Sequence, residues 1–119
     1  MLDVTALVDH ELSGSNIKSG ICHLYVPHTT AAVTINENAD PDVVTDIING
    51  LDKIVPAVGD YRHAEGNSDA HIKASLMGFS AIIPIIDGKL ALGTWQGIYF
   101  CEFDGPRRRK LLIGLNRAY

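Results

Sequence analysis

The 119-residue chain is 46% hydrophobic and 20% charged, a composition typical of one globular domain spanning residues 1–119. The apolar content excludes a disordered chain, and no uncharged apolar run reaches the roughly 18 residues of a membrane span. The net charge of −4 is uneven: residues 1–106 hold 14 acidic and five basic residues, whereas residues 107–119 hold five basic residues and no acidic one, which disfavours nucleic acid and membranes as partners.

Hydrophobic periodicity and turn residues predict the following elements in chain order. We expect a helix over 3–13, strands over 21–27 and 31–36, helices over 41–54 and 68–77, and strands over 80–86, 89–93, 96–103 and 107–115. Asp40-Pro41 is typical of a helix start, Gly78 of a helix end, and Asp87-Gly88 of a type I′ hairpin turn. This order predicts an α+β fold, with antiparallel β-sheets and two or three helices on one face.

Three histidines lie at element junctions, where binding groups are common. His28 follows the first strand, His63 precedes the third helix, and His71 lies within that helix. Three imidazoles with an open position can form a catalytic metal site. The alternative is that they only donate hydrogen bonds at loop ends. Glu65 is then either a fourth ligand or general base, or a loop carboxylate that pairs with a nearby cation.

Arg107, Arg108 and Arg109 open the last predicted strand. Alternate strand residues share a face, so Arg107 and Arg109 are expected on one side. Guanidinium groups bind phosphate or carboxylate in a bidentate manner, which predicts an anion site. A solvated edge strand protected by charge explains the same run. Trp95 is either a packing residue or an aromatic wall for a planar ligand.

Four sequence blocks closely resemble the YjbQ-like family, also called secondary thiamine-phosphate synthase. They begin at His28-Thr29-Thr30-Ala31-Ala32, His63-Ala64-Glu65-Gly66-Asn67, Gly93-Thr94-Trp95-Gln96-Gly97 and Glu102-Phe103-Asp104-Gly105-Pro106-Arg107. The blocks follow the family's order over about residues 20–110. Family members usually begin with an additional strand, whereas this chain begins almost at its first predicted helix.

The resemblance implies a YjbQ-like α+β fold assembled as a homotrimer, with a pocket near a subunit boundary. It implies weak thiamine-phosphate synthase activity, which joins a hydroxymethyl-pyrimidine diphosphate to a thiazole phosphate. The residues expected to act on this small anionic phosphorylated substrate are catalytic His28, Glu65, His71 and Arg107, substrate-binding Thr29, Asn67, Thr94, Trp95, Gln96 and Arg109, and metal-binding His28, His63 and His71.

We therefore expect a metal-assisted transferase that uses zinc or magnesium. Arg107 or Arg109 would orient the leaving diphosphate, His28 or His71 would hold the metal or protonate the leaving group, and Glu65 would act as base. The alternative is a non-enzymatic trimeric protein that binds a phosphorylated metabolite.

The two cysteines, Cys22 and Cys101, lie in apolar stretches and are expected to be buried thiols. The N-terminal residues lack the pattern of a secretory signal, so a cytoplasmic location is expected.

Overall fold

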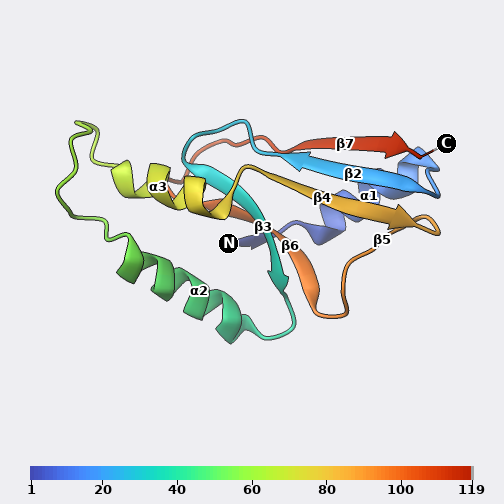
Figure 1. Cartoon of the computed structure of the whole chain (residues 1–119), viewed down its shortest axis with the longest axis horizontal. Helices are drawn as coiled ribbons and strands as arrows, with labels where there is room; N and C mark the ends of the chain where they lie inside the picture. The colour runs from blue at the N-terminus through green and yellow to red at the C-terminus, as the bar shows by residue number, and fades with distance from the viewer. Residues whose placement is uncertain (119) are drawn as a thin grey trace.

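The computed structural model describes residues 1–118 and has an α+β fold in which two antiparallel sheets cross one another (Figure 1). The elements in chain order are β1 (Leu2–Asp3), α1 (Thr5–Ser15), β2 (Gly20–Tyr25), β3 (Ala31–Glu37), α2 (Pro41–Ile54), α3 (Ser68–Met77), β4 (Ser80–Ile86), β5 (Lys89–Leu90), β6 (Gln96–Glu102) and β7 (Leu112–Arg117). One sheet has the strand order β1-β6-β3, and the other has the order β5-β4-β2-β7.

The main core lies between the two sheets and is closed by α1. Val8 and Leu12 of α1 pack against Leu24 of β2, Ile85 of β4 and Ile98 of β6. A second cluster lies on the opposite face of β3 and β6. There, Ala32, Tyr99 and Cys101 pack against Ala74 of α3. The helices therefore belong to different layers, and the expectation that they cover one face of one sheet is wrong.

Local sequence accounts for the bounds of α2 and α3. The Asp40 side chain accepts a hydrogen bond from the Asp42 N–H at 2.9 Å, and Pro41 occupies the first helical position. Gly78 follows α3 with φ of 98°, a conformation that an L-residue with a side chain rarely adopts. The predicted bounds 41–54 and 68–77 are confirmed.

α2 buries no residue fully, although one side of it carries an apolar stripe from which Val44 packs against the second cluster. Figure 1 shows it beside α3, joined to that helix by the long 55–67 loop. Lys73 of α3, only 7% exposed, contacts Asp52 of α2 through an Nζ–Oδ1 distance of 2.6 Å. Asp69, one turn earlier on α3, lies 3.6 Å from the same amine. This ion pair is thus a principal tie between α2 and the rest of the fold.

The last strand differs from the prediction. β7 begins at Leu112 rather than Arg107, so the basic run lies in the β6–β7 loop. At the other end, β1 pairs Leu2 with Phe100 of β6 and forms a short strand ahead of α1, which begins at Thr5. Among residues 1–118, no helix has the length and apolarity needed to cross a bilayer.

Candidate functional site

Three loops converge near the start of β3 and enclose a cavity of about 340 Å³, called here the central cavity. The β2–β3 loop, the segment that leads into α3 and the β6–β7 loop supply its walls. The lining residues are Pro27, His28, Thr29, Thr30, Glu65, Asn67, His71, Asp104, Arg107 and Arg109. Seven of the residues expected in the site therefore meet there, and Thr29, Glu65 and Arg107 come from three segments distant in sequence.

Arg109 fastens two of these segments together. Its Nε and Nη2 donate to the two oxygens of Glu102, with an Nη2–Oε1 distance of 2.6 Å. Nη2 also donates to the Thr30 hydroxyl oxygen at 2.7 Å. The hydrogen bonds from Arg109 lower the pKa of Glu102, because they favour its ionised form. Arg109 thus connects the β6–β7 loop to β6 and to the β2–β3 loop.

Arg107 is held by Asp104, its neighbour across the Gly105-Pro106 turn. Its Nε donates to the Asp104 carbonyl at 2.8 Å, and its Nη2 donates to Asp104 Oδ2 at 2.9 Å. The same Oδ2 accepts from Asn67 Nδ2 at 2.8 Å. The bond from Asn67 and the charge of Arg107 lower the pKa of Asp104. No bond within residues 1–118 uses Arg107 Nη1, which leaves that edge of the guanidinium for a ligand.

Asn67 carries an unpaired acceptor in the cavity wall. Its Oδ1 is buried and has no hydrogen-bond partner within residues 1–118, although its Nδ2 is bonded to Asp104. A buried carbonyl oxygen without a partner costs about 1–3 kcal/mol. A ligand or a water that brings a hydroxyl or N–H donor would remove that cost. The cavity therefore favours an occupant with a hydrogen-bond donor at this point.

His28 has a defined tautomer. Its Nε2 accepts a hydrogen bond from the Lys110 backbone N–H at 2.8 Å, so the neutral ring carries its proton on Nδ1. His28 is thereby a hydrogen-bond donor among the residues that line the cavity. The same bond holds the β6–β7 loop against the β2–β3 loop.

The charges of the cavity nearly cancel. Arg107 is paired with Asp104 and Arg109 with Glu102, while Glu65 adds a further carboxylate. The surplus of positive charge expected from the basic run is therefore absent. A dianion would place two uncompensated charges here, whereas one carboxylate can use the open edge of Arg107 and the His28 donor.

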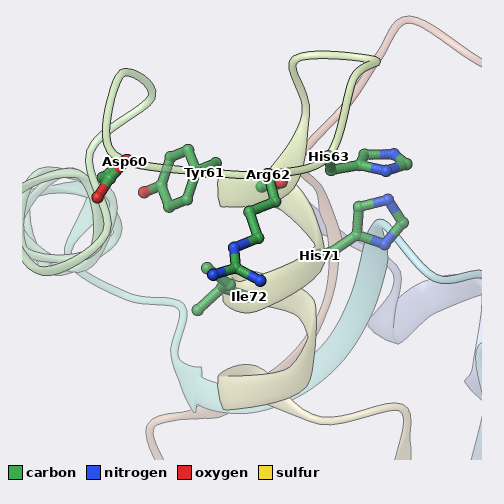
Figure 2. Close-up of a pocket in the computed structure, with 7 residues that line it drawn as sticks. Asp60, Tyr61, Arg62, His63, His71 and Ile72 are labelled. Atoms are coloured by element: carbon green, nitrogen blue, oxygen red, sulfur yellow. The ribbon is translucent and has the colours of Figure 1, made fainter.

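His71 separates the central cavity from a second, larger depression of about 470 Å³, called here the His71 groove. The groove is lined by Asp60, Tyr61, Arg62, His63, Ser68, His71 and Ile72. Figure 2 shows the His63 ring beside the His71 ring, with Arg62 between them and Tyr61. The two imidazole centroids are 5.3 Å apart and meet edge to face.

The side chains of His71, His63 and Glu65 can exchange protons with a ligand in the central cavity. His63 Nε2 lies 3.8 Å from Glu65 Oε2, and His63 borders His71. Imidazole and carboxylate side chains are the usual general acids and bases. The series from His71 through His63 to Glu65 begins and ends at residues that line the central cavity.

The predicted metal ligands do not form a ligand set. Within residues 1–118, no three His, Cys, Asp or Glu side chains are placed to hold a metal ion. His28 Nε2 is occupied by the Lys110 N–H, and His63 belongs to the groove rather than the cavity. The residues as placed therefore do not fit a divalent metal bound by His28, His63 and His71.

Thr94, Trp95 and Gln96 do not belong to this cavity. Thr94 and Trp95 lie in the β5–β6 turn, and Gln96 begins β6. Gln96 pairs with Glu37 at one end of β3, while Glu102 pairs with Ala31 at the other end. Seven strand residues span about 20 Å. The Gly93–Gly97 block is close in sequence to the Glu102–Arg107 block, but this proximity did not predict contact between them. The β5–β6 turn and the central cavity lie at opposite ends of β6 (Figure 1).

Sequence reasoning missed Thr30, Glu102 and Asp104 as site residues. Thr30 and Glu102 hold Arg109, and Asp104 holds Arg107 and Asn67. The order of charges along the sequence could have indicated these residues. Two acidic residues precede the Gly105-Pro106 turn, and two of the arginines that follow pair with them. Opposite charges on the two sides of a tight turn favour such pairs.

Comparison with known proteins identifies one group of relatives. The profile of the family described as "UPF0047 protein YjbQ-like" matches residues 1–118. A UPF0047 protein of Methanocaldococcus jannaschii is 57% identical over 95% of this chain and 82% of its own length. The UPF0047 protein YugU of Bacillus subtilis is 51% identical over 95% of this chain and 86% of its own length.

Solved structures identify the same family. An uncharacterized conserved protein of the YjbQ/UPF0047 family from Clostridium acetobutylicum is 59% identical, with a TM-score of 0.95 over 97% of this chain and 89% of its own. A conserved hypothetical protein from Thermus thermophilus is 40% identical, with a TM-score of 0.90 over 97% of this chain and 90% of its own. The predicted YjbQ-like α+β fold is confirmed.

The functional prediction requires correction. These relatives are described as UPF0047 or uncharacterized proteins, without thiamine-phosphate synthase or metal-assisted activity. The predicted metal-assisted transferase with thiamine-phosphate synthase activity is wrong. The charge balance of the cavity agrees, because the arginines expected to hold a diphosphate are already paired with Glu102 and Asp104.

Proposed function

This chain belongs to the YjbQ-like UPF0047 family, and from that premise we propose that it binds a small hydroxy- or amino-carboxylate in the central cavity. One observation carries the proposal: Asn67, whose Oδ1 is buried and has no partner within residues 1–118, lines the same cavity as Arg107, whose Nη1 makes no bond there either. The Asn67 oxygen needs a hydrogen-bond donor, and the Arg107 guanidinium can bind an anion. A ligand in which a hydroxyl or amine neighbours a carboxylate supplies both groups.

The other cavity residues support this ligand class. Arg107 is oriented by two bonds to Asp104, so its free edge is held before a carboxylate arrives. His28 supplies a neutral Nδ1–H donor. Because the two arginine–carboxylate pairs are neutral and Glu65 adds one negative charge, a monoanion costs less to bury than a dianion.

Three fragments of similar size test the proposal. Glycolate carries both groups, acetate lacks the hydroxyl, and ethylene glycol lacks the carboxylate. In amide NMR titrations of the full chain, glycolate is expected to shift signals of the three cavity loops and to bind about five- to tenfold tighter than acetate, the worth of one hydrogen bond. Ethylene glycol is expected to bind more weakly than either.

A matched pair of variants locates the site. Arg107→Leu removes the open guanidinium edge, whereas Arg108→Leu alters an exposed arginine without a bond in residues 1–118. Glycolate binding is expected to fall at least tenfold in Arg107→Leu and to stay unchanged in Arg108→Leu. Equal affinity for glycolate and acetate, or shifts confined to residues outside the three loops, would overturn the proposal.

We also propose a cytoplasmic location. Cys22 and Cys101 are free buried thiols, as expected in a reducing compartment. Fractionation of cells that express the tagged full chain tests this assignment.

A further inference from the structure

The central cavity is larger than the carboxylate proposed to bind in it. Glycolate fills about 150 Å³, at the roughly 30 Å³ per non-hydrogen atom that a water molecule occupies in the liquid. The cavity measures about 340 Å³. Arg107 and Asn67 account for a carboxylate and one donor, so the remaining volume is open to a further group of the same ligand. His71 marks the direction of that group, because it lines both the cavity and the His71 groove.

The imidazole of His71 is placed to contact a ligand that extends from the cavity into the groove. It forms no hydrogen bond within residues 1–118, so its ring nitrogens are open to a ligand. The His63 ring meets it edge to face, with the centroids 5.3 Å apart (Figure 2). A ligand ring can continue this aromatic pair, because edge-to-face and offset contacts are the preferred arrangements of neighbouring rings.

The wall of the groove away from the two histidines contains a tyrosine that is held in one position (Figure 2). The Tyr61 hydroxyl donates to the Pro56 carbonyl at 2.6 Å. The Tyr61 ring lies against Gly59, where a Cβ would stand 3.1 Å from the ring atom Cε2. Ile72 of α3 adds an aliphatic surface to the same groove. A wall that is fixed before binding loses little conformational entropy when a ligand packs on it.

Arg62 favours an aromatic ring in the groove over an aliphatic one. Its side chain lies between Tyr61 and the two imidazoles in Figure 2, and it forms no ion pair within residues 1–118. A guanidinium over the face of a ring is attracted by the ring quadrupole, which a saturated ring lacks. Asp60 lines the same groove and opposes a second anion beside Arg62. The groove therefore suits a neutral aromatic group.

We propose that the ligand is an aryl-substituted hydroxy- or amino-carboxylate, whose carboxylate lies in the central cavity and whose aromatic ring lies in the His71 groove. The inference rests on the proposed function, which places the carboxylate beside Arg107, and it adds the chemical class of the rest of the ligand. The ring packs between Tyr61 and the imidazole pair, with Arg62 against its face. His71 contacts the part of the ligand that joins the ring to the carboxylate.

Four racemic 2-hydroxy acids test the groove in amide NMR titrations of the full chain. Lactate carries a methyl group, 3-phenyllactate a phenyl ring, 3-cyclohexyllactate a saturated ring of similar size, and malate a second carboxylate. Phenyllactate is expected to bind about tenfold tighter than lactate, because the groove removes part of the phenyl surface from water. Cyclohexyllactate is expected to gain less, and malate nothing. The proposal would be overturned if lactate, cyclohexyllactate or malate bound as tightly as phenyllactate.

Two variants one turn apart on α3 form a matched pair. Ile72→Ala removes aliphatic wall from the groove, whereas Leu76→Ala removes a 60% exposed side chain outside the groove lining. Phenyllactate affinity is expected to fall about threefold in Ile72→Ala and to stay unchanged in Leu76→Ala, with lactate affinity unchanged in both. Arg62→Met is expected to reduce the preference for phenyllactate over cyclohexyllactate. Equal losses in the matched pair, or an intact preference in Arg62→Met, would contradict the placement of the ring.

The same titrations separate this inference from the proposed function. Phenyllactate is expected to shift the signals that lactate shifts and, in addition, those of residues 60–63 and Ile72. In Arg107→Leu, both acids are expected to lose affinity in the same proportion. If lactate binds as expected and phenyllactate gains neither affinity nor these additional shifts, this inference fails and the proposed function stands. If neither glycolate nor lactate binds, both fail.

Discussion

Arg109 and Glu102 form a two-point ion pair across the turn that separates β6 from the basic run. Both oxygens of Glu102 accept from the guanidinium, and the Arg109 side chain is only 12% exposed. Because Arg109 also donates to Thr30, one side chain holds two of the three loops around the central cavity. The ligand site is therefore assembled by ion pairs before it meets a ligand.

Loss of this pair is expected to destabilise the whole fold. Arg109→Met removes four hydrogen bonds and leaves Glu102 part-buried without its partner. We expect the free energy of unfolding to fall by about 1.5–3 kcal/mol, the range for bonds to charged groups. Urea denaturation measures the change. Arg108→Met is the control and should remain within about 0.5 kcal/mol of the wild type. Equal losses in the two variants would contradict the role assigned to Arg109.

Acid is expected to weaken the same region. The bonds from Arg109 hold the pKa of Glu102 below its ordinary value of 4.5, and the bond from Asn67 lowers the pKa of Asp104. A carboxyl group whose pKa is lower in the folded state adds stability above its unfolded pKa and loses it as the pH falls through the folded value. The urea midpoint should therefore drop as the pH falls below about 4.5. Glu102→Gln should reduce that dependence, and an unchanged profile would refute the assignment.

Asp52 is expected to control the mobility of α2. Asp52→Asn weakens the bond to buried Lys73, which then keeps only Asp69 at 3.6 Å. Because α2 buries no residue, local opening should become more frequent, and about 1 kcal/mol corresponds to roughly fivefold faster amide exchange. Hydrogen exchange by mass spectrometry over residues 41–54 measures it. Asp46→Asn, which alters an exposed carboxylate on the same helix that forms no ion pair within residues 1–118, should leave the exchange unchanged.

Both cysteines are expected to resist thiol reagents in the folded protein. Burial raises the pKa of Cys101 to about 11 and also raises that of Cys22. Since the thiolate is the reactive form, colorimetric thiol titration at pH 8 should be slow until urea unfolds the chain. Rapid native labelling of one equivalent would show that one of the two sites opens locally.

Helix ends were predictable because their signals are local. Asp40-Pro41 starts α2 by capping, and Gly78 ends α3 because it adopts a positive φ. The start of β7 was not predictable from such signals. Residues 107–110 alternate suitably for a strand, but Arg107 and Arg109 bond back to Asp104 and Glu102 and hold the segment in a loop. Ion pairs across the Gly105-Pro106 turn outweighed the strand preference.

Part of the candidate site was also predictable from local sequence signals. His28 follows the end of β2 and Arg107 follows the end of β6, so a meeting of these two loop residues could be anticipated. Trp95 was misplaced, since its distance from the cavity depends on the length and register of β6 rather than on its neighbours in sequence. The charge balance also escaped prediction, because it depends on which carboxylate each arginine meets.

The bonds that shape the central cavity limit which of its residues can change to alter ligand selectivity among related proteins. Arg109, Thr30 and Asp104 close the fold as well as the cavity, so substitutions there change folding and recognition together. Thr29, Glu65 and His71 line the cavity, and no side-chain hydrogen bond within residues 1–118 ties them to another loop. New ligand preferences should therefore arise first at these three positions, where recognition can vary while the framework is retained.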